Sequence, residues 1–309
     1  MNKKIILLMG PTASGKTDLA IKIAQSGNYE IINGDAMQIY QEIPIITAQP
    51  TIEEKSSIAH HLFGYKLGDE ACSVANWLVD AQSKIEEVLS RNNIPIIVGG
   101  SGLYFKALTD GISNIPTIDL AIREETRNLF DLIGRDAFYQ ELLILDPSIA
   151  EKIKSGDSQR MIRAFEVMKQ TGRSISDWQQ QTKSFSPFQF LQIQLDIPRP
   201  VLHAKINKRF ILMAEGGAID EARYIMNKYD GQKLSINKAH GIPELINYLK
   251  GVCTLEQAIE RAQIITRQYA KRQVTWLRNQ TNHLMKTRYI GHTDFKAVAS
   301  DVDKFIDRS

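Results

Sequence analysis

Cysteine, net charge and long apolar runs are all scarce in this chain of 309 residues, and each scarcity excludes a class of protein. Its two cysteines, Cys72 and Cys253, have no metal-like spacing, so we expect reduced, buried thiols and no disulfide framework. Because the net charge is only +3, a polyanionic partner would have to bind a local basic patch. The six histidines form no ligand cluster, which argues against a structural metal.

No apolar run approaches the roughly 18 residues that a membrane-spanning helix requires. No signal peptide precedes the first apolar run either, so we expect a cytoplasmic protein without membrane contact. A hydrophobic fraction of 43% and a charged fraction of 24% are ordinary for a globular chain. The length permits one large domain or two smaller ones.

The first distinctive motif is GPTASGKT at residues 10–17, a complete match to the phosphate-binding loop pattern. An apolar run at 4–9 predicts a buried strand before it, and 18–24 has helical composition after it. This context favours a phosphate site over a chance glycine-rich turn, since backbone N–H groups and a helix N-terminus then surround the anion. We expect Lys16 to reach outer phosphate oxygens and the Thr17 hydroxyl to bind Mg²⁺. The expected phosphate-binding residues are Gly10, Pro11, Thr12, Ala13, Ser14, Gly15, Lys16 and Thr17.

Strand and helix patterns alternate through the first hundred residues. Apolar runs predict strands at 29–32 and 94–98, with a weaker one at 61–65, and the spacing of 74–89 predicts a helix buried on one face. The run 191–195 alternates polar and apolar residues, which predicts an edge or half-exposed strand. The fold class is therefore α/β, a P-loop NTPase-like parallel sheet flanked by helices.

Residues 117–187 contain no strand pattern and predict an inserted all-helical domain, with helices over 120–145 and 149–170. We expect 1–116 and 188–309 to form the core domain with a helical C-terminal part.

Basic residues gather on two of the expected helices. Arg160 and Arg163 share a helical face in the insertion, and a capping box at Thr254–Gln257 begins a long helix that carries Arg267, Lys271 and Arg278. Such faces are usually only solvated, but two of them beside a phosphate-binding cleft favour an anionic macromolecule.

Two further features follow apolar strands, where ligands bind parallel sheets. Asp35 comes directly after the strand at 29–32, so its carboxylate suits a general base or a water-mediated Mg²⁺ ligand; a helix N-cap is an equal alternative. The turn Gly99–Gly102 suits a second anionic group, or is simply a tight turn that needs glycine for positive φ. His60 and His61 are interpreted as structural or partner-contacting.

Taken together, the motifs resemble the tRNA dimethylallyltransferases, also called tRNA isopentenylpyrophosphate transferases, over nearly the whole chain. The resemblance rests on GPTASGKT at 10–17, NGDAMQIY at 33–40, TAQP at 47–50, HHLFGY at 60–65, GGSGLYF at 99–105, QRMIRAFEVMKQTGR at 159–173 and TRQYAKRQVTW at 266–276. The phosphate loop is common to many families, whereas its combination with the other motifs is specific.

Several positions depart from the family pattern. Ala36 stands where serine is usual, Ser101 replaces threonine, and Gln49 replaces lysine. Ile45-Ile46 replaces a typical Ile-Gly, and the segment 239–244 is altered. These differences suggest a divergent member or second paralogue and affect the expected tRNA preference more than the chemistry.

The resemblance implies transfer of a dimethylallyl group from dimethylallyl diphosphate to the exocyclic amine of the adenosine adjacent to the anticodon, with release of diphosphate. It implies Asp35 and Ser101 as catalytic residues, Arg209 as a diphosphate contact beside the loop, Mg²⁺ as cofactor, and a tRNA partner bound through its anticodon stem-loop to a monomer. The implied tRNA contacts are Asp35, Ala36, Met37, Gln38, Ser101, Arg123, Gln159, Arg160, Met161, Ile162 and Arg163.

Three other functions remain open from the residues. A P-loop small-molecule or nucleotide kinase would use Lys16 and Mg²⁺ in the same way but would convert ATP to ADP. An adenylate isopentenyltransferase would act on free nucleotide, against which the two basic helices argue. A non-catalytic RNA-binding module would not need Lys16, Thr17, Asp35 and Ser101 together.

Overall fold

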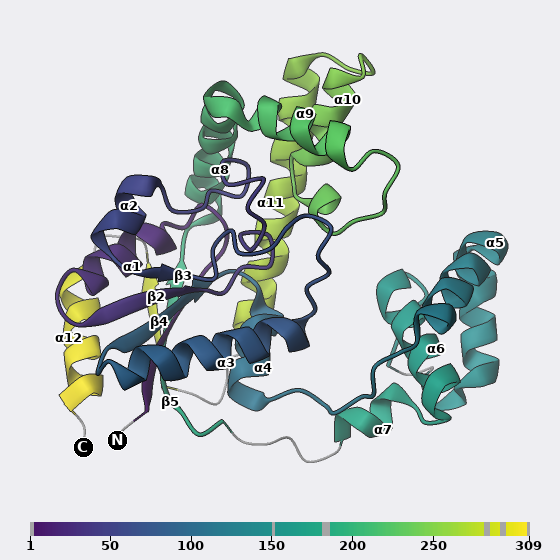
Figure 1. Cartoon of the computed structure of the whole chain (residues 1–309), viewed down its shortest axis with the longest axis horizontal. Helices are drawn as coiled ribbons and strands as arrows, with labels where there is room; N and C mark the ends of the chain where they lie inside the picture. The colour runs from purple at the N-terminus through teal and green to yellow at the C-terminus, as the bar shows by residue number, and fades with distance from the viewer. Residues whose placement is uncertain (1–2, 150–151, 181–185, 281–284, 291–294, 308–309) are drawn as a thin grey trace. The chain divides into compact units, whose positions relative to one another are not determined.

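The computed structural model describes residues 3–149, 152–180, 186–280, 285–290 and 295–307. The chain divides into two compact units, residues 1–109 with 186–309 and residues 110–185. Figure 1 traces both along the chain. The second unit begins before the expected boundary at 117 and ends close to the expected 187.

A six-stranded parallel sheet forms the centre of the first unit, counted over the described residues (Figure 1). Its strand order is β3-β2-β4-β1-β5-β6, so β1 lies inside the sheet between β4 and β5. This confirms the expected fold class. The strands are β1 (Lys4–Met9), β2 (Tyr29–Asn33), β3 (His60–His61), β4 (Ile94–Gly99), β5 (Gln189–Asp196) and β6 (Met285–Ile290).

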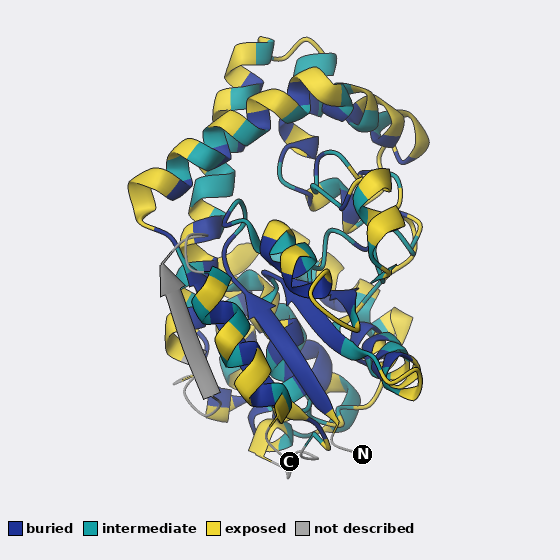
Figure 2. Ribbon diagram, turned by 90° about the vertical axis from the view of Figure 1, so that its left-hand side faces the viewer, coloured by how far each residue is buried: buried dark blue, intermediate teal, exposed yellow. Residues whose placement is uncertain are grey.

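Helices cover the sheet and bury its apolar strands, as the dark blue strands of Figure 2 show. Leu19 and Ile23 of one helix and Phe305 of another pack with Ile6 and Leu8 of β1 in one core cluster. A third helix contacts β2 and β4. These helices are α1 (Lys16–Ala24), α12 (Phe295–Asp307) and α3 (Val74–Ser90), and the first unit also has α2 (Ile52–Ser57) and α4 (Gly102–Asp110).

Two strand predictions were wrong in detail. The alternating run in β5 predicted an edge strand, but β5 pairs with β1 and β6, and Gln192 and Gln194 are buried in it. Polar residues in a covered strand give the same alternation as solvent-facing ones. The strand expected at 61–65 is limited to His60–His61, and β6 lies in the tail that was expected to be mainly helical.

The C-terminal helices form a further packed cluster within the first unit. Phe210, Ala222, Ile225 and Leu245 are buried together there with Ile43. The Thr254 hydroxyl accepts from the Gln257 N–H at 3.3 Å, and the Gln257 side chain accepts from the Thr254 N–H at 3.0 Å. This confirms the expected capping box. The helices are α8 (Arg199–Met213), a π-helical turn Ala214–Ala218, α9 (Ile219–Lys228), a 3-10 turn Ile236–Lys238, α10 (Ile242–Leu249) and α11 (Leu255–Gln280).

The second unit has only helices as its regular elements over the described residues, preceded by an irregular segment at 111–119. Phe138 and Leu142 of α5 (Leu120–Leu145) pack against Met161 and Phe165 of α6 (Ser158–Thr171), and Gly134 interrupts α5 with non-helical angles. The 3-10 turn Pro147–Ile149 and α7 (Ile175–Gln180) complete it. The helix expected from 149 starts at Ser158, and residues 150–151 lie outside the described residues.

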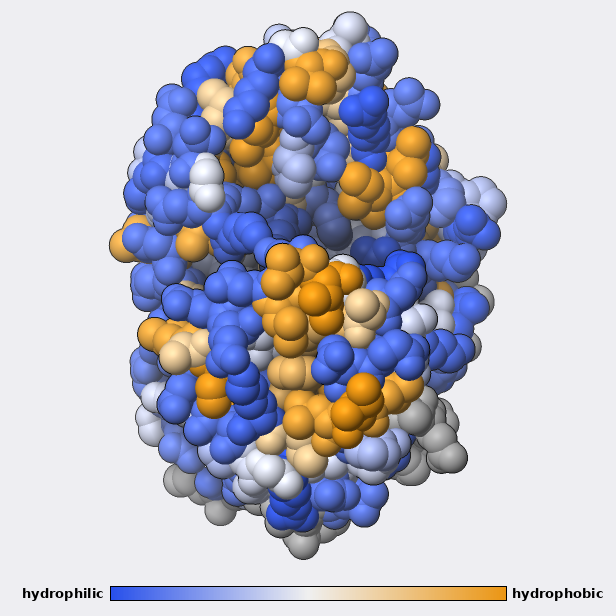
Figure 3. Space-filling view, turned by 90° about the vertical axis from the view of Figure 1, so that its right-hand side faces the viewer, coloured by the Kyte–Doolittle hydropathy of each residue, from blue (hydrophilic) through white to orange (hydrophobic). Residues whose placement is uncertain are grey.

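The molecular face in Figure 3 is mainly hydrophilic, with separate hydrophobic patches. In the described part of the chain, every helix is too short or too polar to cross a membrane. Cys72 and Cys253 are free thiols, as expected, but they are half-buried and not buried.

Candidate active site

The phosphate loop Gly10–Thr17 joins the interior strand β1 to α1. Ala13 and Gly15 take left-handed backbone angles, with φ of 60° and 85°, and Gly15 occupies the N-cap position of α1. Lys16 begins the helix, and its Nζ donates to the Pro11 carbonyl at 2.8 Å, which folds the side chain over the loop. A helix N-terminus with this geometry is suited to an anion.

Charged groups from three elements surround this loop. Burial lowers the pKa of Lys16 to about 8, although the nearby Asp35 carboxylate opposes that effect; Arg209 lowers it further. Burial also lowers the pKa of Arg209, against the influence of Asp35 and Asp18. The structure therefore brings Lys16, Arg209 and Asp35 into one electrostatic group.

Asp35 lies in a tight turn after β2. Its backbone N–H donates to Asn33 Oδ1 at 2.8 Å, and its Oδ1 accepts from the Met37 N–H at 3.0 Å. Residues 36–39 form bends and turns, so the helix N-cap alternative was wrong. One carboxylate oxygen holds the turn, which fixes the orientation of the group.

The turn Gly99–Gly102 joins β4 to α4, as expected for a helix start. These glycines are not among the residues with positive φ, so that explanation of them was wrong. They are needed for close approach: a Cβ on Gly99 would lie 2.1 Å from the Gly34 carbonyl oxygen, and one on Gly100 would lie 2.1 Å from Gln273 Nε2. Within the turn, Ser101 Oγ accepts from the Ala36 N–H at 2.9 Å.

Two cavities, of about 290 and about 890 Å³, adjoin these elements. Asp35 and Arg209 line both, so they lie where the cavities meet. The larger cavity includes Lys16 and Thr17 of the phosphate loop. The smaller one is lined by the apolar side chains Met37, Ile46, Ile206, Phe210 and Met213 together with Ala36, His240, Tyr269 and Arg272.

The expected acceptor-side residues Ala36, Met37 and Gln38 lie in the same turn as Asp35. Gln38 has its amide engaged, because Nε2 donates to the carbonyls of Thr47 and Ala48 at 2.9 and 2.8 Å. Gln38 thus holds the segment containing the TAQP motif next to the larger cavity, which Gln38 and Thr47 both line.

The remaining expected tRNA contacts belong to the second unit. Gln159 and Arg160 are exposed on α6, whereas Arg163 and Ile162 on α6 and Arg123 on α5 are half-buried. Met161 is fully buried in the core of that unit, where it packs with apolar side chains, so its side chain is not exposed to a partner; its tRNA contact stays a prediction.

The basic face expected on α11 is partly used inside the fold. Arg267 donates to Asn207 Oδ1 at 2.6 Å, and Arg278 lies 3.6 Å from Asp196. Lys271, Arg272 and Arg278 are exposed on the same helix. Only part of the basic residue set on α11 is therefore available to a partner.

Sequence reasoning missed Tyr269 and His240. Their rings meet edge to face with centroids 4.8 Å apart, and both line the smaller cavity with Asp35. Burial and the Asp35 charge raise the pKa of Tyr269, while hydrogen bonds to Ser101 and Gln273 oppose this shift. The positions 269, 273 and 276 share one helical face, a spacing in the motif that could have revealed them.

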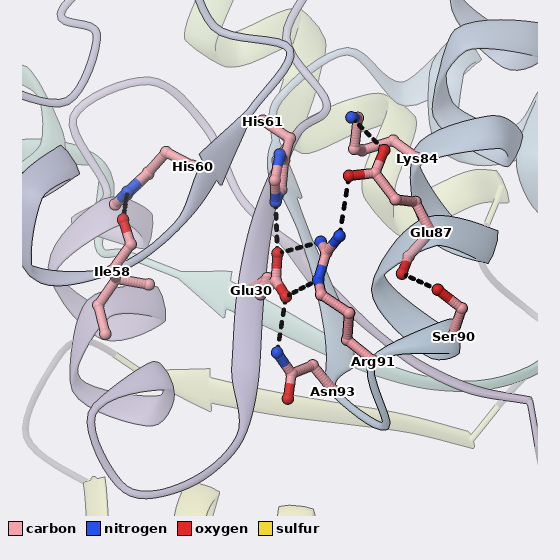
Figure 4. Close-up of polar contacts among 9 residues, drawn as sticks. All are labelled: Glu30, Ile58, His60, His61, Lys84, Glu87, Ser90, Arg91 and Asn93. Carbon is pink, nitrogen blue, oxygen red and sulfur yellow. Dashed lines mark hydrogen bonds and ion pairs between the residues drawn. The ribbon is translucent and has the colours of Figure 1, made fainter.

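The histidine pair serves the fold. His61 Nε2 lies 2.6 Å from Glu30 Oε2, and His60 Nδ1 lies 2.8 Å from the Ile58 carbonyl oxygen (Figure 4). Glu30 also accepts from Arg91 and Asn93 in the same cluster. Over the described residues, no group of three or more His, Cys, Asp or Glu side chains is placed to bind a metal ion.

A phosphate loop on an interior strand of a parallel sheet, with Asp35 and Arg209 where two cavities meet and Lys16 in the larger one, defines a phosphate-loop α/β enzyme. Residues 38–280 match the family model described as IPP transferase. The chain belongs to this family, which confirms the resemblance seen in the motifs.

Curated relatives and solved structures agree with the family assignment. The chain is 43% identical to a tRNA dimethylallyltransferase of Pelagibacter ubique, covering 92% of this chain and 91% of the relative. It is 42% identical to one from Rickettsia conorii, over 98% and 84% of the two chains.

Two solved structures cover the chain almost completely. A tRNA isopentenylpyrophosphate transferase from Bacillus halodurans superimposes with a TM-score of 0.70 at 34% identity, covering 99% of this chain and 96% of its own. A eukaryotic dimethylallyltransferase acting on tRNA superimposes with a TM-score of 0.82 at 28% identity, covering 100% of this chain and 81% of its own.

Proposed function

We propose that this chain transfers a dimethylallyl group from dimethylallyl diphosphate to the exocyclic amine of the adenosine adjacent to the anticodon in tRNA, releasing diphosphate. Family membership supports the reaction class, since the relatives are tRNA dimethylallyltransferases. The observation that carries the residue assignment is the position of Asp35 and Arg209, which line both the loop cavity and the apolar cavity.

The phosphate loop stabilises the leaving group in this reaction. The bond between the prenyl carbon and the diphosphate oxygen breaks, and the electron pair leaves with the diphosphate. Lys16, Arg209 and the N-terminus of α1 lie where they can offset the negative charge that develops on it. No phosphoryl group is passed on, so the loop acts as a leaving-group site.

Asp35 acts as the proton acceptor. The adenine amine is a weak nucleophile because its lone pair is delocalised into the ring. As the nitrogen–carbon bond forms, the amine loses a proton, and the Asp35 carboxylate takes it. The Met37 N–H holds one oxygen of Asp35 at 3.0 Å, so the carboxylate is oriented before the substrate binds.

The loop is suited to Mg²⁺. Thr17 lines the larger cavity with Lys16 and Asp18, and the buried Ser14 Oγ has no hydrogen-bond partner among the described residues. Mg²⁺ in phosphate sites takes few protein oxygens and completes its shell with water and phosphate. Thr17 would hold the ion, which supplies positive charge beside the diphosphate when it is bound.

In this proposal the second unit binds the anticodon stem-loop through Arg123, Gln159, Arg160 and Arg163. The protein acts as a monomer. The exposure of Arg160 and Gln159 supports this role. The target base must leave the stack of the anticodon loop to reach Asp35, which costs less in a loop than in a duplex.

The decisive experiment incubates the protein with anticodon stem-loop RNA, Mg²⁺ and dimethylallyl diphosphate. We expect the RNA to gain the mass of one dimethylallyl group and free diphosphate to accumulate. ATP replaces the prenyl donor in a parallel reaction. Release of ADP there, with no mass gain in the first reaction, would overturn the proposal in favour of a kinase.

A further inference from the structure

Helix α11 presents three side chains to the active site from one face. Tyr269 lines the smaller cavity, Gln273 is 5% exposed, and Trp276 lies against Gly102, where a Cβ would come within 2.2 Å of the indole ring. The spacing of four and three residues places all three on one helical stripe. One stripe of α11 therefore lies beside the site from Tyr269 to Trp276.

Gln273 uses both ends of its side-chain amide on two separate loops. Its Oε1 accepts from the Thr12 N–H at 2.8 Å, and its Nε2 donates to the Gly100 carbonyl at 3.0 Å. In the sequence, Thr12 lies 261 residues before Gln273, and Gly100 lies 173 residues before it. A buried amide with both groups paired is held in one orientation.

The two loops that Gln273 joins serve different substrates in the proposed reaction. Thr12 belongs to the phosphate loop, which contacts the leaving diphosphate. Gly100 precedes Ser101, whose Oγ holds the Ala36 N–H in the turn that carries Asp35. Gly100 has no room for a Cβ because Gln273 lies directly against it. Gln273 thus connects the phosphate loop directly with the Gly99–Gly102 turn and, through Ser101, with the turn that carries Asp35.

We propose that Gln273 is a positioning residue that fixes the phosphate loop and the Gly99–Gly102 turn relative to each other, and so sets the distance between the leaving diphosphate and the attacking amine. The proposal rests on the function proposed above. The rate depends steeply on the placement of the reacting groups, because a misplacement of about 1 Å can lower it roughly 10²-fold.

The chemistry of the side chain makes the role testable. A neutral amide donates and accepts at once, whereas a glutamate carboxylate accepts from Thr12 but faces the Gly100 carbonyl oxygen without a proton. The Tyr269 hydroxyl, which also hydrogen-bonds to Gln273, stays protonated because burial raises its pKa. Protonating that carboxyl restores a donor. The Gln273→Glu variant should therefore regain activity relative to the native protein as pH falls, whereas Gln273→Met, which makes neither hydrogen bond, should not.

Kinetics with both substrates provide the test. We expect Gln273→Glu at neutral pH to lower kcat by about 10²-fold, with much smaller changes in the KM values for dimethylallyl diphosphate and RNA. Gln263→Glu is the matched control: Gln263 lies on the same helix, and its Nε2 donates to the Asn207 carbonyl at 3.1 Å. Thermal unfolding checks that each variant is folded.

Hydrogen exchange at the Thr12 amide supplies a readout that does not depend on turnover. We expect faster exchange in Gln273→Met than in the native protein and no change in Gln263→Glu. Native kcat in both Gln273 variants, or unchanged Thr12 exchange in Gln273→Met, would overturn the positioning role. An inactive native protein with faster Thr12 exchange in the variant would instead reject the proposed reaction and leave the structural link intact.

Discussion

Ser101 Oγ accepts a hydrogen bond from the Ala36 N–H at 2.9 Å, which ties the turn after β4 to the turn that carries Asp35. Replacing Ser101 by alanine leaves that N–H without its acceptor, at a cost of about 1–3 kcal/mol where the group is buried. We expect Ser101→Ala to lower kcat about tenfold or more, because Asp35 is then less well placed. Ser101→Thr keeps the hydroxyl and should retain most of the activity.

Steady-state kinetics on the two Ser101 variants, with stem-loop RNA and dimethylallyl diphosphate, check this expectation. Equal kcat values for Ser101→Ala and Ser101→Thr would show that the Ala36 contact does not matter for turnover.

Replacing Asp35 by asparagine separates catalysis from binding. The amide oxygen can still accept from the Met37 N–H, the contact that Asp35 Oδ1 makes at 3.0 Å, so the turn should persist. The proton acceptor is lost, and we expect turnover to fall by about 10²–10⁴-fold. RNA affinity, measured by filter binding or anisotropy, should change little. A parallel loss of affinity and turnover would mean that Asp35 acts in binding.

The lowered pKa of Lys16 gives the prenyl-donor site a pH dependence. Burial lowers this pKa to about 8, with Asp35 opposing the effect and Arg209 adding to it. Below that pH Lys16 is an ammonium that attracts the diphosphate, and above it the charge is lost. We expect the affinity for dimethylallyl diphosphate, measured by calorimetry without RNA, to fall as the pH rises above about 8.

Lys16→Met is the control for this titration. It should bind the prenyl donor weakly, with little further loss over the same pH range. A native affinity that stays constant well above pH 8 would show that Lys16 does not contact the diphosphate.

The parts of the site that lie close together in sequence were predictable, and the parts that depend on distant packing were not. The phosphate loop followed from one motif between an apolar strand and a helix. The position of β5 was predicted wrongly because of Gln192 and Gln194. An alternating sequence pattern cannot distinguish a buried glutamine from an exposed one. Gln273 was missed because its partners are fixed only when α11 packs on two loops far away in the chain.

The Glu30 cluster shown in Figure 4 should contribute measurably to stability. Burial opposes the charged form of Glu30, but hydrogen bonds from Arg91, Asn93 and His61 outweigh it and hold the pKa of the carboxyl at about 2. Since this folded-state value lies below the ordinary 4.5, the stabilisation is fully present above about pH 4.5 and is lost as the pH falls towards 2.

Denaturant unfolding of Glu30→Gln measures this contribution. We expect a loss of about 1–3 kcal/mol at neutral pH, because buried donors lose a charged acceptor. The gap to the native protein should narrow as the pH falls below 4.5. Glu87→Gln removes a more exposed partner of the same Arg91 and should cost less. Similar losses in both variants would argue against a special role for the buried carboxylate.

Arg160 and Arg163 on α6 are the residues with which we expect the second unit to bind RNA phosphates. Each neutralised phosphate releases counterions on binding, so the salt dependence of affinity reports how many phosphates the protein engages. In Arg160→Ala/Arg163→Ala we expect weaker RNA binding and a slope of log affinity against log salt that is shallower by about 1 for each phosphate that is no longer neutralised. Affinity for dimethylallyl diphosphate should not change, because the site proposed for that ligand lies in the first unit.

Lys169→Ala is the matched control for the arginine pair. Lys169 lies on the same helix, about 180° around it from Arg160, and pairs with Glu125. The Lys169→Ala substitution removes a positive charge from the second unit but leaves the Arg160 face unchanged. A loss of RNA affinity caused only by the lower net charge would therefore appear in both variants. If the double variant keeps the native salt slope, or if Lys169→Ala flattens it equally, RNA phosphates do not bind the Arg160 face of α6.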